Sequence, residues 1–181
     1  MEVRKLLNFM KNKFFPVILI LLAVLVRFLP HPANVAPIAA MALFGGAYFN
    51  KKYALLVPIL VMFLSDIFLG FHNTMPFVYG SFLLTGVIGM RLKNRVKAKR
   101  VFGSALLSSV IFYVVTNFGV WMTSGMYEMT GLGLVKCYAL AIPFFRNTLA
   151  GDLFYTVMMF GGYELFCRYY KTIEAKNSVR E

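Results

Sequence analysis

The chain has 181 residues, of which 60% are hydrophobic and only 14% are charged. A mean hydropathy of +0.71 excludes a soluble domain, because a chain of this size could not bury so much apolar surface, and it indicates a lipid bilayer as the surroundings. The net charge of +12 comes from Lys and Arg in short stretches between apolar segments. Such stretches orient membrane proteins, so we expect no nucleic-acid partner.

The N-terminal region predicts a basic cytoplasmic start followed by a first membrane helix. Residues 1–13 are basic and mildly amphipathic. Residues 14–30 are apolar except for Arg27, and Pro30 ends them. The same order of charge and hydropathy is found in signal peptides. The poor cleavage site and the apolar segments that follow favour an uncleaved helix.

The next segment, residues 34–49, is short and rich in alanine and glycine. A re-entrant hairpin is the alternative to a full crossing here. Its small residues recur one helical turn apart, which permits close helix packing or docking of a partner; they are Ala36, Ala40, Ala42 and Gly46. Residues 53–71 then form a clear span that contains Pro58 and a single carboxylate, Asp66.

The strongest topology signal is the loop 91–100, which has six Lys and Arg residues and no acidic residue. We expect it in the cytoplasm. The predicted spans 76–92 and 101–122 flank it. The loop after residue 122 has no Lys or Arg over 123–133 and is expected outside.

The C-terminal part predicts one further crossing. Residues 132–145 are apolar but short, and we interpret them as an outer-face or re-entrant helix broken at Pro143. Residues 147–169 then cross the membrane, and residues 170–181 form a cytoplasmic tail.

These segments predict an all-α integral membrane protein with six transmembrane helices and both termini in the cytoplasm. Residues 14–169 form its single domain. The expected crossings are 14–30, 34–49, 53–71, 76–92, 101–122 and 147–169.

Polar residues within the apolar segments fall at one depth in this topology. Asp66, Asn117 and Asp152 each lie five residues from the outer end of their helix, or roughly 7–8 Å below the surface. Such residues are costly in hydrocarbon and mark functional sites. We expect a pocket for a small polar solute, open to the outside, in which carboxylates and amides bind the solute and aromatic rings cover it. The predicted binding residues are Asn34, Asp66, Tyr79, Asn117, Trp121, Asn147 and Asp152.

A structural alternative is that Asp66 and Asp152 pair with Arg27 or Arg146 and only hold the bundle together. Enzymatic interpretations lack support, because no G-x-S-x-G, H-E-x-x-H or P-loop motif occurs. We therefore expect no enzyme, no cofactor and no metal site. Cys137 and Cys167 are expected to be unpaired thiols.

The strings PHPANVAPIAAMALFGGAYF, TNFGVW and IPFFRNTLAGDLFY resemble an uncharacterised family of small bacterial membrane proteins regarded as transport proteins. More distantly, the pattern resembles the substrate-binding S components of energy-coupling factor (ECF) vitamin transporters. In those, a proline-containing loop, a short helix with glycines and a span ending in an acidic residue and glycine follow one another. The corresponding residues here are Pro37, Gly45, Gly46, Asp66 and Gly70.

This resemblance implies a multi-pass protein of the bacterial inner membrane with a vitamin or similar nutrient as substrate. It also implies docking to a shared ECF transmembrane subunit with two ATPases. The first helix lacks the Ala-x-x-x-Ala docking motif of S components and has only Ala23. Cobalt and nickel relatives have a histidine where Glu2 stands, which argues against metal uptake. The alternatives are a scaffold of the cell-shape type and a proton-coupled transporter.

Overall fold

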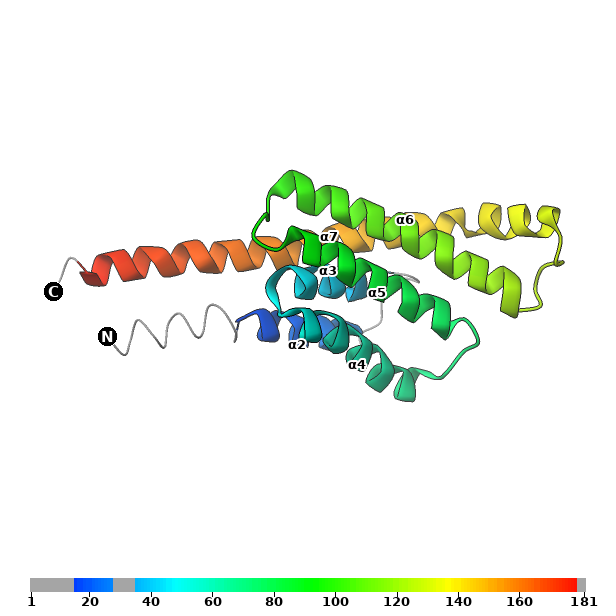
Figure 1. The fold of residues 1–181 in the computed structure, drawn as a ribbon, viewed down its shortest axis with the longest axis horizontal. Helices are drawn as coiled ribbons and strands as arrows, with labels where there is room; N and C mark the ends of the chain where they lie inside the picture. Colours follow the sequence, from blue (N-terminus) through cyan, green and yellow to red (C-terminus); the bar gives the residue numbers. More distant parts are fainter. Residues whose placement is uncertain (1–14, 28–34, 179–181) are drawn as a thin grey trace.

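The computed structural model describes residues 15–27 and 35–178, and every regular element in these ranges is an α-helix (Figure 1). The prediction of an all-α protein is thereby confirmed. The helices are α2 (Phe15–Arg27), α3 (Ile38–Tyr48), α4 (Lys51–Leu69), α5 (Met75–Leu92), α6 (Ala98–Thr123) and α7 (Gly131–Ser178).

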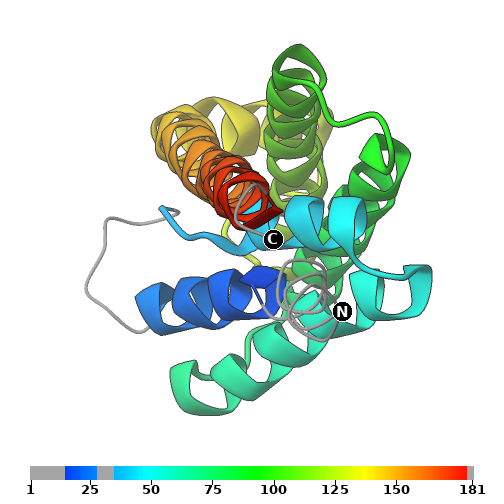
Figure 2. The ribbon, with the colours of Figure 1, turned by 90° about the vertical axis from the view of Figure 1, so that its left-hand side faces the viewer.

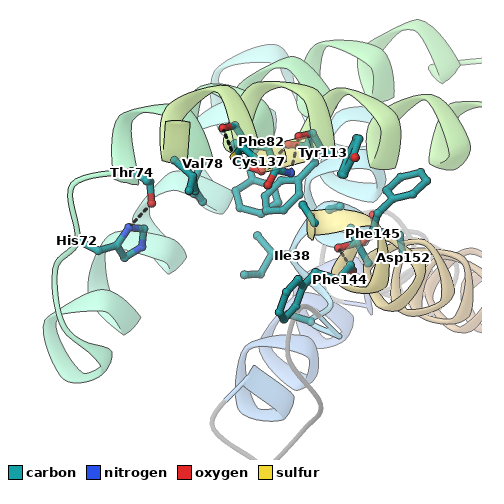
Figure 3. Close-up of a pocket in the computed structure, with 18 of the residues that line it drawn as sticks. Ile38, His72, Thr74, Val78, Phe82, Tyr113, Cys137, Phe144, Phe145 and Asp152 are labelled. Carbon is teal, nitrogen blue, oxygen red and sulfur yellow. Dashed lines mark hydrogen bonds between the residues drawn. The ribbon is translucent and has the colours of Figure 1, made fainter. Parts of the chain in front are cut away.

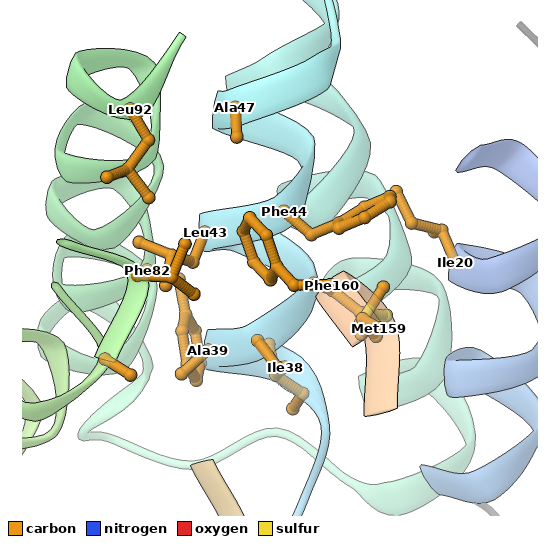
Figure 4. Packing of buried hydrophobic residues seen from close by; sticks show 14 of the residues in the cluster. Ile20, Ile38, Ala39, Leu43, Phe44, Ala47, Phe82, Leu92, Met159 and Phe160 are labelled. Atoms are coloured by element: carbon orange, nitrogen blue, oxygen red, sulfur yellow. The ribbon is translucent and has the colours of Figure 1, made fainter. Parts of the chain in front are cut away.

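Helix α3 is the centre of the bundle. It packs against all five other described helices, and its residues Ile38 to Ala47 are all buried (Figures 2 and 4). Its 11 residues extend only about 16 Å, roughly half the thickness of a hydrocarbon core. Helix α3 is therefore shorter than the predicted segment 34–49 and too short to cross a membrane by itself. It is a half-length helix enclosed by longer ones.

The closest packing joins α3 to α5 through glycines. A Cβ atom on Gly46 would overlap the carbonyl oxygen of Gly86 and the backbone of Gly89, and one on Gly89 would overlap the carbonyl of Leu43. Small residues allow this approach of two backbones. Ala40 and Ala42 are also fully enclosed, so these positions of α3 present no surface on which a partner protein could dock. The docking part of that prediction is wrong for them.

Helix α7 is continuous over 48 residues and passes through Pro143 without ending. The predicted separate helix at 132–145 and the break at Pro143 are therefore wrong, and the helix also continues beyond the expected end at residue 169. Proline removes one backbone hydrogen bond, which helices in bundles tolerate when neighbouring packing holds both sides. Here Tyr113 donates a hydrogen bond to the carbonyl of Tyr138, and Tyr138 donates one to Val114, which holds the start of α7 against α6.

The connections gather at two ends of the bundle. At one end lies the basic connection between α5 and α6, where Lys93 Nζ donates a hydrogen bond to the carbonyl of Phe49, 3.4 Å away. The α3–α4 turn, the start of α2 and the end of α7 lie toward this end (Figure 1). The turns 70–74 and 124–130 lie at the opposite end, and each includes a glycine with positive φ, Gly70 and Gly125.

The outer face of the bundle is strongly apolar. Large hydrophobic side chains with more than half of their surface exposed occur on several helices, including Leu25, Phe68, Phe102, Val157 and Leu165. Among the described residues, α5 and α6 are long and apolar enough to cross a membrane, while the apolar parts of α3 and α4 are shorter. An exposed apolar surface of this extent is unusual for a protein in water.

Candidate functional site

A cavity of about 640 Å³ lies between α3, α4, α5, α6 and α7, toward the end of the bundle that carries the turns 70–74 and 124–130 (Figure 3). The first residues of α3 lie on its wall because this helix is short and begins within the bundle. Aromatic side chains form much of the lining, namely Phe82, Phe112, Tyr113, Tyr127, Phe144 and Phe145. The polar groups are fewer and include His72, Thr116, Asn117, Thr148 and Asp152.

Asp152 is the most unusual residue of this wall. Its side chain is 4% exposed, and Oδ2 accepts a hydrogen bond of 2.7 Å from the Ser109 hydroxyl of α6. Ser109 also lies 3.1 Å from the carbonyl oxygen of Ala105, so its single proton serves two acceptors. Among the described residues, no cation forms an ion pair with Asp152, and Arg146, its predicted alternative partner, is exposed. A buried carboxylate with so few partners is energetically costly.

Asn117 lies on the same wall, on α6. Its side-chain amide donates a hydrogen bond of 2.8 Å to the carbonyl of Tyr113, which holds the side chain along its own helix. The thiol of Cys137, also on the cavity wall, lies 3.4 Å from the backbone oxygen of Asn117. The structure thus brings together two of the predicted binding residues, Asn117 and Asp152, from two different helices.

Asp66 and Tyr79 are joined by a hydrogen bond between α4 and α5. The Tyr79 hydroxyl of α5 donates a 2.6 Å hydrogen bond to Oδ2 of Asp66 in α4. Asp66 is only 2% exposed. Neither side chain lines the cavity, although Met62 and Val78, one helical turn or less away, do. The predicted alternative partner Arg27 has a side chain outside the described residues. The hydrogen bond between Tyr79 and Asp66 therefore joins α4 to α5 outside the cavity lining.

Two other predicted binding residues, Trp121 and Asn147, do not lie on the cavity wall. Trp121 donates its indole N–H to the carbonyl of Glu128, 3.0 Å away, and fastens the turn after α6. Asn147 lies on α7 but is not on the cavity wall. Asn34 lies outside the described residues. Ala36, predicted as a packing residue, lines the cavity instead.

Several wall residues were not predicted. Phe144 and Phe145 follow Pro143, which suggested a helix end, and Thr148 is one turn further along the continuous helix. Ser109 is not on the wall but donates to Asp152, and it belongs to a visible series of hydroxyl residues in α6. Nothing in the sequence singled it out as the partner of Asp152, because that contact depends on how α6 and α7 are rotated against each other.

No metal site is apparent in the described part of the chain. It contains no group of three His, Cys, Asp or Glu side chains placed to hold an ion. Cys137 and Cys167 are both free thiols. His72, at the rim of the cavity, has its Nδ1 atom 2.7 Å from the hydroxyl of Thr74.

The described residues thus form an all-helical bundle with an apolar outer face, two helices long and apolar enough to cross a membrane, and an aromatic cavity with a buried carboxylate. The chain belongs to a family of unknown function, DUF6580, whose model matches residues 8–175. No curated protein and no solved structure matches it.

Proposed function

We propose that this protein is a multi-pass membrane protein that binds a small organic solute in the cavity beside Asp152 and serves its uptake. The observation that carries the proposal is the buried carboxylate of Asp152, which has one hydroxyl partner and faces an aromatic cavity. Such a costly arrangement persists where a ligand supplies the missing partner.

The membrane part of the proposal has six crossings, one of which contains α3. The basic connection between α5 and α6 favours the cytoplasm for its end of the bundle. The hydrogen bond from Lys93 to Phe49 puts the α3–α4 turn at that same end, in agreement with an even number of crossings before it. The cavity, near the opposite end, then opens toward the outside.

The lining supports a particular class of solute. A volume of about 640 Å³ is in the range of pockets for small organic ligands. Phe82, Phe112 and Phe145 offer ring faces and edges to a flat apolar body. Asp152 accepts a hydrogen bond or a positive charge. The proposed solute is therefore a nutrient with a planar or apolar body and a cationic or hydrogen-bond-donating group.

The energy source belongs to the same proposal. With no nucleotide motif in the chain, a solute-binding subunit of the ECF type would take its energy from a separate membrane subunit with ATPases. A proton-coupled transporter is the alternative, because Asp152 could carry a proton. A scaffold is less favoured, because a closed and internally paired polar layer would leave no cavity beside a carboxylate.

The topology can be tested by cysteine labelling in intact cells. In a background with Cys137→Ala and Cys167→Ala, Asn73→Cys should react with a membrane-impermeant maleimide added outside, whereas Arg95→Cys should react only after cell disruption. Both positions are exposed and lie in connections between helices, so accessibility within the protein is matched. Labelling of position 95 in intact cells would contradict the proposed orientation.

The binding function is tested by native mass spectrometry of the protein purified gently from its own host. We expect a fraction of the protein to carry one additional small molecule, whose mass and fragmentation identify the solute. Protein purified from cells grown in a minimal medium should lose it and regain it when the identified compound is added. Purified protein that never binds any component of a nutrient extract would overturn the proposal.

A further inference from the structure

We propose that a groove at the basic end of the bundle binds one anionic glycerophospholipid of the cytoplasmic leaflet, with its phosphate at Lys99 and Arg168. The groove lies between the start of α6 and the part of α7 that follows Asp152, on the basic-end side of the Ser109–Asp152 contact, and has a volume of about 680 Å³. It is separate from the solute cavity. The inference depends on the proposed membrane location but not on the identity of any solute.

The walls of the groove suit an acyl chain. Val101, Leu153 and Phe160 form its depth, while Phe102 and Val157 are 51% and 65% exposed at its sides. In a membrane this opening faces the lipid tails, so a chain can enter it from the bilayer without leaving hydrocarbon. An apolar groove alone would accept any lipid.

The charge at one end of the groove selects among lipids. Lys99 and Arg168 both line it, and Arg95, Lys97 and Arg100 lie beside Lys99 in the sequence. Glu164 is the single acid in the lining, and it already pairs with Arg168 at 3.1 Å. Helix α6 begins there at Ala98, after the N-cap residue Lys97, with no side-chain cap and no acid in its first turn, which adds the positive end of a helix dipole. Basic pockets between helices on the cytoplasmic side are typical sites for anionic head groups.

An unsatisfied hydroxyl provides independent evidence for a ligand in the groove. Thr156 lines it, is 3% exposed, and its Oγ1 has no hydrogen-bond partner among the described residues. Other threonines in these helices, such as Thr148, donate to the carbonyl four residues earlier. Buried hydroxyls without partners are rare and call for an explanation.

The depth of Thr156 agrees with a lipid. Helices α6 and α7 are antiparallel and meet at Ser109 and Asp152. Counted from that contact toward the basic end, Thr156 is four residues away and Lys99 is ten, so Thr156 lies roughly 9 Å deeper. The side chain of Lys99 is long enough to span most of this distance and thus to reach a phosphate that lies between the levels of the two residues. The ester oxygens of the same lipid, which lie below its phosphate, can then accept a hydrogen bond from Thr156.

The test compares phosphatidylglycerol with phosphatidylcholine of identical acyl chains, each added to delipidated full-length protein in detergent and counted by native mass spectrometry. We expect the protein to retain one phosphatidylglycerol with about 5- to 30-fold preference, as one to two cations near a lipid of net negative charge provide, because phosphatidylcholine has no net charge. Lys99→Gln with Arg168→Gln should abolish this preference. Lys136→Gln with Arg146→Gln removes the same two residue types from exposed positions at the other end and should keep it.

Thr156→Val provides a second measurement that leaves all charges in place. It should weaken retention of both lipids by about 2- to 10-fold, the effect of one hydrogen bond, and leave the preference unchanged. Equal retention of the two lipids by the unmodified protein would overturn the inference. So would a preference that survives the Lys99 and Arg168 substitutions, or one that the Lys136 and Arg146 substitutions abolish equally. If the protein proved not to bind a solute in its cavity, the expected results of these lipid measurements would stay the same.

Discussion

Replacing Asp152 by asparagine should abolish retention of the solute while leaving the protein at least as stable as before. Asparagine keeps the shape and can still accept a hydrogen bond from Ser109, but it cannot provide a negative charge. Loss of a buried charge pair with a ligand weakens binding by about 2–5 kcal/mol, or roughly 30- to 4,000-fold. The measurement is occupancy by native mass spectrometry, followed by titration of the identified solute into both proteins.

The direction of the stability change separates a binding role from a structural one. Among the described residues, Asp152 has one hydroxyl partner and no ion pair, so removing its charge lowers the cost of burial. We therefore expect an equal or higher thermal midpoint in detergent for Asp152→Asn. A variant that loses about 3 kcal/mol of stability would instead indicate that Asp152 holds the bundle together, which is the alternative that the sequence left open.

Glu164→Gln is the matched control. It removes a carboxylate from the same helix at an exposed position, where its partner is Arg168. Exposed ion pairs contribute about 0–1 kcal/mol, so both stability and solute occupancy should stay close to those of the unmodified protein. Equal loss of solute from both variants would show that the effect comes from the net charge of the protein and not from the cavity.

The second large effect is expected from adding a single methyl group to the contact between α3 and α5. Gly46→Ala should lower stability by about 1–3 kcal/mol or more, because the new Cβ meets the backbone of Gly86 and Gly89, which cannot rotate away as a side chain can. Gly89→Ala should act in the same way against Leu43. The measurement is the thermal midpoint, or the midpoint of a denaturing-detergent titration, of purified protein.

Two other glycines provide the comparison. A Cβ at Gly80 in α5 or Gly103 in α6 would meet nothing within 4 Å. Alanine there should be neutral or stabilising by up to about 1 kcal/mol, because it favours helix more than glycine does. The double variant at 46 and 89 should lose less than the two single losses added, because one separation of the helices relieves both overlaps. If Gly46→Ala were as stable as Gly103→Ala, the close packing would be refuted.

Composition and local pattern predicted the class of the fold. High apolar content, basic residues confined to short stretches and the spacing of Ala42 and Gly46 are properties that can be read along one helix. They indicated an all-helical protein, the basic end of the bundle and a tightly packed second helix. The burial of Ile38 to Ala47 agrees with a segment of small and apolar residues on all faces.

Helix lengths were predicted less well. Pro143 lacks the backbone N–H of a regular helical residue, which is why a break was predicted there. Helix α7 nevertheless continues through it, because Tyr113 and Tyr138 hold the preceding segment against α6. Helix α3 begins at Ile38, directly after Pro37, which is a local signal inside the predicted segment 34–49. In α7, contacts between helices outweigh a local preference.

The sequence by itself determined that this chain is helical, that its surface is apolar and that charged groups within its helices are few and therefore informative. Only the tertiary structure decided which of those groups meet. Asp66 pairs with Tyr79, whereas Asp152 meets Ser109 and faces the cavity with Asn117. The physical reason is that periodicity is a property of each helix alone. The partner of a side chain depends on the rotation and the shift of one helix against another, which the packing of all six described helices sets together.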